Sequence, residues 1–168
     1  WGLAQDESVA VRYARGAAPT IGSEDRPEDP RKAEVLREGS DLVIFGIGPI
    51  LANALEAAEK LDQDGVSVKV VDARCVKPLD TAMLDSLAGM PMVTIEENTV
   101  VGGFGSAVTE YYTDQGVENL RIERHGFPDA FIDHATRNEQ ILEFGLDTDS
   151  IVLAVKALAG AGAAEKVV

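Results

Sequence analysis

An arginine at the end of a predicted strand is the most promising chemical group in this 168-residue chain. Ser8 to Tyr13 is rich enough in β-branched and small residues to form a strand, and Arg15 follows it. A guanidinium there presents two parallel donors that suit a phosphate, and Gly16 lets the backbone turn sharply beside it. We therefore favour a phosphate-binding role for Arg15 over the alternative of a plain surface arginine. Arg12 projects from the opposite face of the strand, and we expect it to be structural.

Glu96 and Glu97 are a second candidate, because two carboxyl groups with different pKa values can act as acid and base. Neighbouring residues on a strand point to opposite faces, so this pair cannot share one substrate. We expect the two acids to cap the following glycine loop or to contact another domain. Histidine side chains often take part in catalysis, but no cysteine or serine lies at a useful spacing from His125 or His134. We expect hydrogen-bonded structural roles for both.

Glycines follow two of the predicted strands and precede helices. The free amides of a helix that starts at Gly102-Gly103-Phe104-Gly105 could hold an anion, but the lysine typical of a nucleotide loop is absent. We expect these glycines, like Gly46 and Gly48, to allow sharp turns and close strand–helix packing. Farther upstream, Pro78 fixes the backbone of a turn and Asp80 is expected to cap the next helix.

Composition narrows the class of protein. A formal charge of -14 repels nucleic acids and anionic membranes, and no run of about 18 apolar residues suits a membrane span. We expect a soluble, cytoplasmic protein with neither as a partner. The single cysteine, Cys75, cannot form an internal disulfide, and with two histidines it supports no metal cluster, so we expect it to be buried. The opening at Trp1 leads us to expect a piece of a longer polypeptide.

The pattern of apolar residues predicts an α/β fold. Residues 33–37 and 42–45 are expected to form an antiparallel hairpin, and residues 66–71, 90–95 and 120–123 further strands. Helices are expected over residues 50–61, 81–87, 102–112, 138–144 and 149–158, the last one capped by Asp149 or Ser150. This alternation predicts a mainly parallel five-stranded sheet with one antiparallel strand and helices on both faces.

Prolines and glycines set the expected boundaries along the chain. Residues 1–15 are the end of a preceding unit, and residues 16–32, which include Pro19, Pro27 and Pro30, are a linker. Residues 33–158 form the α/β domain. Residues 159–168, rich in alanine and glycine, are expected to form a flexible tail.

Four motifs carry a resemblance to a known family. They are Val11 to Gly16, Asp72 to Asp80, Thr94 to Ser106, and Gly126 to Ile132. From about residue 8 to residue 158, the chain resembles the C-terminal part of 1-deoxy-D-xylulose 5-phosphate synthases, thiamine-diphosphate enzymes of the transketolase superfamily. The family usually has proline at the position of Ala14 and often leucine at that of Phe127.

The resemblance implies an enzyme that condenses pyruvate with D-glyceraldehyde 3-phosphate, releasing carbon dioxide, for isoprenoid, thiamine and pyridoxal synthesis. It implies that Arg15 binds the aldehyde's phosphate, that residues 1–15 end the pyrimidine-binding middle domain, and that the enzyme is a homodimer. The Gly-Asp-Gly motif of the diphosphate site is absent here. Thiamine diphosphate and Mg²⁺ should therefore bind to upstream domains, with no catalytic, cofactor or metal residue in this segment, which alone should be inactive.

Other interpretations stay open. Transketolases and the β subunits of 2-oxoacid dehydrogenases share this domain type, although the motifs around Arg15 and Gly126 favour the synthase. A non-catalytic interaction module is a different class of function. An upstream Gly-Asp-Gly motif would favour the enzyme, and an initiator methionine directly before Trp1 would favour the module.

Overall fold

The computed structural model describes residues 29–164, together with Ala4, Asp6, Ser8, Pro19, Ile21 and Gly22; for residues 161–164 it describes the backbone alone. This part of the chain contains five strands and five helices, which alternate from β2 to α4. The strands are β1 (Glu34–Arg37), β2 (Leu42–Ile47), β3 (Val68–Asp72), β4 (Met92–Thr99) and β5 (Ile122–Phe127). The helices are α1 (Leu51–Gln63), α2 (Thr81–Leu87), α3 (Phe104–Asp114), α4 (Arg137–Glu143) and α5 (Thr148–Ala164).

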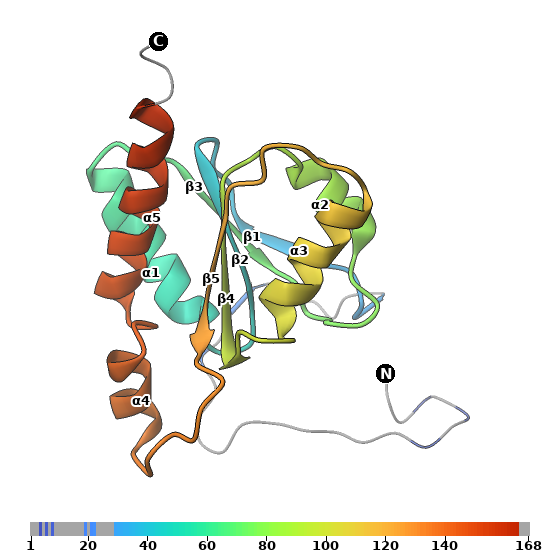
Figure 1. Ribbon diagram of the computed structural model, residues 1–168, viewed down its shortest axis with the longest axis vertical. Coiled ribbons are helices and arrows are strands. Elements are labelled where there is room, and N and C mark those ends of the chain that lie inside the picture. Colours follow the sequence, from blue (N-terminus) through green and yellow to red (C-terminus); the bar gives the residue numbers. More distant parts are fainter. Residues whose placement is uncertain are drawn as a thin grey trace.

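The five strands form one sheet in the order β1-β3-β2-β4-β5. Strands β3, β2, β4 and β5 run parallel to one another, and β1 is antiparallel to β3. The predicted fold class, a mainly parallel sheet with one antiparallel strand, is therefore confirmed. Helices cover both faces: α1 and α5 lie on one side, and α2 and α3 lie on the other (Figure 1).

The predicted hairpin between the first two strands is wrong. β1 pairs with β3, in a register that places Glu34 opposite Asp72, and β2 lies on the other side of β3. The turn residues between β1 and β2 suit a reversal, but β2 is buried from Leu42 to Gly46 and pairs with parallel strands on both sides. Burial of β2 at the centre of the sheet outweighs the local turn preference, so β1 is left at the edge.

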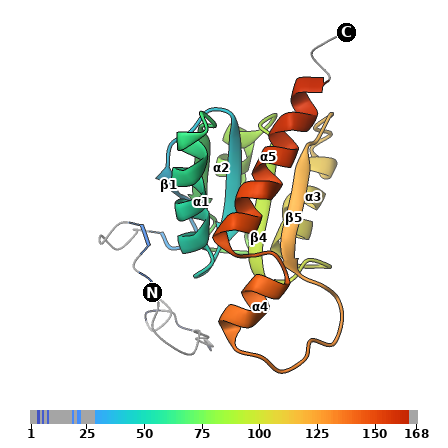
Figure 2. The ribbon, with the colours of Figure 1, turned by 90° about the vertical axis from the view of Figure 1, so that its left-hand side faces the viewer.

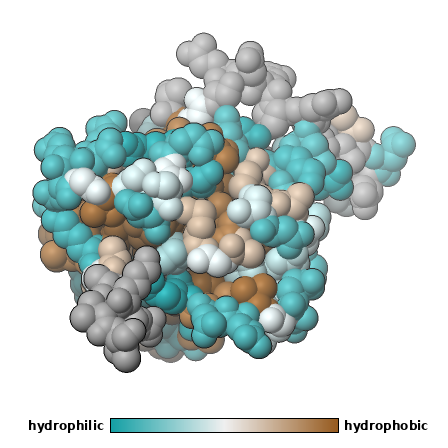
Figure 3. Space-filling model, turned by 90° about the horizontal axis from the view of Figure 1, so that it is seen from above, coloured by the Kyte–Doolittle hydropathy of each residue, from teal (hydrophilic) through white to brown (hydrophobic). Residues whose placement is uncertain are grey.

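Alternation along the strands divides the core into two layers. Ile44 and Val70 pack with α1 and α5, whereas Phe45 and Val71 pack with α2 and α3. Helix α1 contributes the buried set at three- and four-residue spacing that the sequence predicts, namely Leu51, Ala54, Ala58 and Leu61. Seen from the top of Figure 1, polar residues surround the hydrophobic ones on the edge where the parallel strands begin (Figure 3).

The last helix differs from the sequence prediction at both ends. Asp147, rather than Asp149 or Ser150, caps α5: its carboxylate accepts hydrogen bonds from the Asp149 amide at 3.1 Å and the Ser150 amide at 3.2 Å. The hydrogen bond from the Ser150 hydroxyl, together with these two amide bonds, lowers the pKa of Asp147. The helix continues to Ala164, so residues 159–164 of the expected tail are helical. Alanine is the best helix former, which explains the extension.

Candidate functional site

The carboxyl ends of the parallel strands form the edge where ligands bind in α/β sheets of this kind. β2 and β4 are neighbours at this edge. The helices that follow them, α1 and α3, cover opposite faces of the sheet, so the two connections leave the edge in opposite directions. The sequence places a glycine turn after each strand. Gly48 has a φ of +86° and Gly102 a φ of +68°, a conformation that glycine adopts without steric cost.

Glu96 on β4 fixes the start of α3. Its side chain is buried, with 2% exposed, and its carboxylate accepts hydrogen bonds from the Phe104 amide at 2.8 Å and the Gly105 amide at 2.9 Å. These are amides of the first helical turn that lack partners within the helix. The sequence-based expectation that this acid caps the glycine loop is confirmed. The positive end of α3 is therefore occupied by the protein's own carboxylate and is not available to an external anion.

The glycines of this turn are required by close packing. A Cβ at Gly103 would lie 2.1 Å from the Thr99 carbonyl oxygen, and one at Gly105 would lie 2.4 Å from the Thr94 hydroxyl. On β5, a Cβ at Gly126 would lie 2.7 Å from the Asn98 carbonyl, where the register between β4 and β5 shifts. The predicted role of Gly103 and Gly105 in close strand–helix packing is confirmed.

Arg124 on β5 supports the same turn, although no sequence pattern singled it out. Its guanidinium donates to the Ser106 hydroxyl at 2.7 Å and to the Val100 carbonyl at 3.2 Å. Ser106 in turn donates to Val100 and accepts from the Gly102 amide at 3.1 Å. The turn between β4 and α3 is thus held by Glu96 from inside and by Arg124 from the neighbouring strand.

Glu97 lies next to Glu96 but serves a different contact. It accepts two hydrogen bonds from the Arg137 guanidinium, at 2.6 and 2.7 Å, which join β4 to the start of α4. The hydrogen bonds to Glu97 raise the pKa of Arg137. A capping box between Thr136 and Glu139 closes the same helix end. The two acids therefore have separate partners and do not form an acid–base pair.

The predictions for the two histidines and the cysteine agree with the structure only in part. His125 is half-buried and lies 3.4 Å from the Glu123 carboxylate, as a hydrogen-bonded structural role requires. His134 is exposed in the segment between β5 and α4, and among the described residues it has no hydrogen-bond partner. Cys75 is half-buried in the loop after β3, so its predicted burial is wrong, because the loop lies at the surface of the sheet edge.

The phosphate-binding candidate lies outside the described residues. Arg15, Arg12 and Gly16 all precede residue 29 and are not among the six isolated positions that the structure describes. The prediction for Arg15 therefore stays a prediction. Within the described residues, no group of three or more histidine, cysteine, aspartate or glutamate side chains could hold a metal ion.

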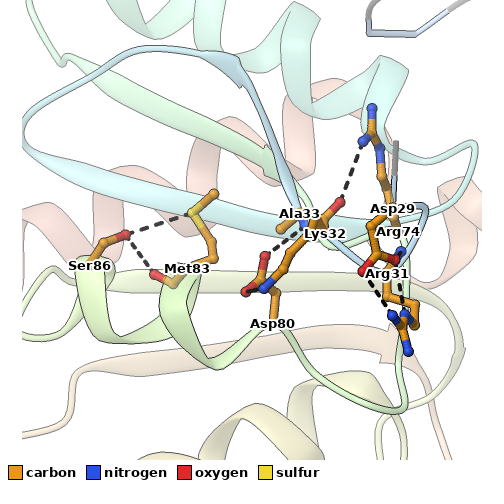
Figure 4. A network of polar contacts seen from close by, with 8 residues as sticks. All are labelled: Asp29, Arg31, Lys32, Ala33, Arg74, Asp80, Met83 and Ser86. Atoms are coloured by element: carbon orange, nitrogen blue, oxygen red, sulfur yellow. Dashed lines mark hydrogen bonds and ion pairs between the residues drawn. The ribbon is translucent and has the colours of Figure 1, made fainter. Parts of the chain in front are cut away.

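A second polar cluster lies beside the start of β1 (Figure 4). Asp80, predicted to cap α2, occupies the cap position but makes no capping hydrogen bond. Its carboxylate instead accepts from the Lys32 ammonium and from the Ala33 amide, both at 3.0 Å. Arg74 donates to the Glu34 carboxylate and to the Lys32 carbonyl. No sequence pattern indicated these partners, because they lie 40 to 48 residues away along the chain.

Charge stabilises this cluster. Burial by itself would raise the pKa of Asp80, but the hydrogen bonds from Lys32 and Ala33 outweigh it and the pKa is lowered. Asp72, at the end of β3, shows the reverse balance: burial raises its pKa even though it accepts a hydrogen bond from the Arg74 amide at 2.8 Å. Asp80 therefore stays ionised beside Lys32 at neutral pH.

At the carboxyl edge, Glu96, Arg124 and Glu97 are each hydrogen-bonded to other residues of the domain. No helix among the described residues is long and apolar enough to cross a membrane.

This arrangement is that of a known domain family. Residues 31–151 match the model of the transketolase C-terminal domain, and the chain belongs to that family. The match includes all of β1 to α4 and ends within α5.

Similar proteins specify the relationship further. The chain is 42% identical over 156 residues to the 1-deoxy-D-xylulose-5-phosphate synthase of Bacillus mycoides, and 45% identical over 157 residues to that of Geobacillus thermodenitrificans. The matches cover 88% and 91% of this chain but 24% and 25% of those synthases. The chain therefore spans about a quarter of the length of these relatives, and it corresponds to their C-terminal quarter.

A solved structure gives the same fold. The chain matches a split-gene transketolase, solved as an inactive β4 tetramer, with a TM-score of 0.79 and 33% sequence identity. The match covers 87% of this chain and 48% of that one. Both kinds of comparison relate this chain to part of a larger enzyme, which implies partner domains or subunits.

Proposed function

We propose that this chain is the C-terminal part of a 1-deoxy-D-xylulose 5-phosphate synthase, which condenses pyruvate with D-glyceraldehyde 3-phosphate and releases carbon dioxide. The single observation that carries this proposal is the identity of 42–45% to two such synthases over about nine-tenths of the chain. The segment does not catalyse the reaction alone. It supports the assembly of the enzyme and supplies Arg15 to the phosphate of the aldehyde substrate.

Thiamine diphosphate and Mg²⁺ do not fit the described residues. The amides at the start of α3, which could otherwise hold a diphosphate, are bonded to Glu96. The described residues also offer no cluster of metal ligands. We propose, as the resemblance to the synthases implies, that upstream domains of the enzyme bind the cofactor and the metal ion.

Exposed apolar side chains support an association role for the carboxyl edge. Val76, Val101 and Phe131 are large apolar residues in the loops that follow β3, β4 and β5, and all three are exposed. The segment that holds Phe131 extends beyond the end of the sheet (Figure 2). We propose that this edge packs against the rest of the enzyme in a homodimer, because apolar groups gathered at one edge mark an interaction surface.

A pair of arginine variants tests the substrate role. Arg15→Ala in the full-length enzyme should raise the KM for the phosphorylated aldehyde about 10- to 100-fold and leave the KM for pyruvate nearly unchanged, since a charge-assisted contact to phosphate is lost. Arg12→Ala is the matched control and should change neither constant more than about twofold. Equal effects of Arg15→Ala on both substrates would refute the phosphate assignment.

Transketolase is the second candidate function, favoured by the fold match to the split-gene transketolase. The two reactions differ in their donor. A synthase releases carbon dioxide from pyruvate, whereas a transketolase moves a two-carbon ketol unit between sugar phosphates without decarboxylation. Carbon dioxide release that depends on pyruvate and on the aldehyde would favour the synthase.

A further inference from the structure

The segment between β5 and α4 presents a fully exposed aromatic ring on a fixed base. Its start is held by a backbone hydrogen bond of 2.9 Å from the Val100 amide to the Phe127 carbonyl. Its end is held by the two hydrogen bonds from Arg137 to Glu97. Between these points Phe131 is completely exposed, and the segment projects beyond the ends of the strands (Figure 2). An aromatic side chain presented in this way is typical of an anchor at a protein interface.

The same segment carries two acids that no described cation neutralises. Asp129 and Asp133 are exposed, and among the residues that the structure describes neither carboxylate has a hydrogen-bond or ion-pair partner. Unpaired carboxylates beside an exposed ring favour a partner surface that combines a cation with apolar groups, because opposite charges across an interface attract. We call residues 128–134 the acidic loop.

The loop between β3 and α2 offers this combination. Val76 is 43% exposed, and Lys77 and Pro78 beside it are exposed as well. Within the described part of the chain Lys77 has no acidic or hydrogen-bond partner, whereas every other described lysine and arginine has one. In a chain with a formal charge of -14, acidic side chains are plentiful, so this free ammonium stands out. We call residues 76–78 the basic tip.

The acidic loop and the basic tip lie at opposite ends of the row of parallel strands. β2 and β4 separate β3 from β5, so the two loops leave the carboxyl edge about 14 Å apart, at three strand spacings. A twofold rotation about an axis between β2 and β4 exchanges the two ends. The acidic loop of one copy then faces the basic tip of the other, and this contact occurs twice. Val101, which follows β4 and is 59% exposed, lies next to the axis and faces its counterpart.

Charge favours this arrangement over a contact between like ends. Two acidic loops placed against each other would bring together Asp129 and Asp133 of both copies, and two basic tips would bring together both Lys77 side chains. Each of these contacts is repulsive, and like charges facing across an interface exclude a wrong pairing. The twofold contact instead sets each basic tip against an acidic loop.

We propose that the carboxyl edges of two copies of this domain form a twofold interface, in which the acidic loop of each copy binds the basic tip of the other. This inference rests on the homodimer of the proposed function and names the surfaces that form it. It gives one role to the three exposed apolar side chains of this edge, Val76, Val101 and Phe131.

Two charge reversals test the contact in the full-length enzyme. Lys77→Glu and Asp133→Lys should each weaken the homodimer about tenfold or more in light scattering over a range of concentrations, because each replaces two attractions by two repulsions. The matched controls make the same changes of charge away from the edge: Lys156→Glu on α5, and Asp114→Lys at the end of α3. Both controls should keep the dissociation constant within about twofold. Equal weakening in variants and controls, or none in either, would overturn the interface.

A mixture of the two single variants identifies the pairing itself. In a mixed dimer of Lys77→Glu and Asp133→Lys chains, one contact has both charges reversed and the other has neither, so both contacts are attractive. We expect native mass spectrometry, with one variant carrying heavy isotopes, to show mixed dimers in large excess over either homodimer. The double variant should regain the affinity of the parent, because both of its contacts are reversed together. A statistical mixture, or a double variant as weak as the single ones, would overturn the pairing.

The failure of this inference can be told apart from the failure of the proposed function. A monomeric parent enzyme refutes the homodimer and the twofold contact together. A dimeric parent that is insensitive to both charge reversals refutes the twofold contact alone. Carbon dioxide release from pyruvate in the presence of D-glyceraldehyde 3-phosphate, measured on the parent, decides the proposed reaction separately.

Discussion

Glu96 illustrates how a single buried carboxylate can determine what a helix end is able to bind. It is almost completely buried and is bonded to the first amides of α3, so a site that resembles an anion-binding loop in sequence is closed by the protein itself. The alternation of strand residues argued against an acid–base pair and led to the expectation that Glu96 caps the glycine loop or contacts another domain; capping is what the structure shows. The sequence could not predict Arg124 or Arg74, because their partners lie 18 residues or more away along the chain.

Removing the Glu96 carboxylate should destabilise the domain strongly. Glu96→Ala leaves the amides of Phe104 and Gly105 buried without acceptors, and we expect the free energy of unfolding to fall by about 2–4 kcal/mol in urea denaturation. Glu143→Ala, which changes an exposed acid on α4, should alter it by about 0.5 kcal/mol or less. Equal losses in the two variants would contradict the capping role.

Tyr112 should make the stability of the domain sensitive to alkali. It is buried, its hydroxyl donates to the Leu84 carbonyl at 2.8 Å, and burial raises its pKa above the ordinary value of 10.0. The stability it contributes is therefore present below about pH 10 and is lost as the pH rises, because the unfolded chain ionises first.

Thermal melts of the parent and of Tyr112→Phe can check this expectation. At pH 7 the variant should be less stable by about 1 kcal/mol, for the lost hydrogen bond. Above about pH 10 the difference should shrink or change sign, because phenylalanine does not ionise. A difference that stays constant from pH 7 to about pH 11 would show that the pKa of Tyr112 is not raised by folding.

At the scale of elements, close packing explains which parts of the fold could be predicted. The periodicity of α1 and the glycines before α3 gave correct elements, because burial and tight turns are local properties of a sequence. The pairing of β1 was predicted wrongly, because strand order depends on which strand is buried at the centre of the sheet and not on the turn beside it.

Two glycines should respond in opposite ways to alanine. A methyl group at Gly105 would lie 2.4 Å from the Thr94 hydroxyl, so Gly105→Ala should destabilise the domain by about 1–3 kcal/mol. Gly160 lies in α5 with open space around it, so Gly160→Ala should stabilise by about 0.5 kcal/mol or slightly more. Urea denaturation of both variants would check the two signs; a loss at Gly160 as large as at Gly105 would refute the packing argument.

For the whole molecule, the exposed apolar loops at the carboxyl edge predict association. Phe131→Ser should weaken the proposed homodimer of the full-length enzyme about tenfold or more. The Phe131 ring is fully exposed in the single chain, and an aromatic ring that becomes buried at an interface commonly contributes over about 1 kcal/mol to binding. Leu153→Ser, on α5 and away from this edge, is the matched control. Light scattering over a range of concentrations would measure both. A parent enzyme that is monomeric at micromolar concentration would contradict the prediction.

Over the whole molecule, the match across residues 31–151 shows the family, whereas the reaction is a proposal. Its fold and its place in the C-terminal quarter of the synthases could be inferred from the sequence, whereas the location of the reacting groups in upstream domains stays a prediction. The assignment of Arg15 to a phosphate comes from its motif and stays a prediction, because Arg15 lies outside the described residues.

A chimeric enzyme tests the central claim most directly. Residues 1–168 would replace the C-terminal quarter of the Geobacillus thermodenitrificans synthase, and the product formed from pyruvate and D-glyceraldehyde 3-phosphate with thiamine diphosphate and Mg²⁺ would be measured. We expect the folded chimera to release carbon dioxide and form 1-deoxy-D-xylulose 5-phosphate, whereas residues 1–168 alone form none. A correctly assembled chimera without product, or product from residues 1–168 alone, would contradict the account.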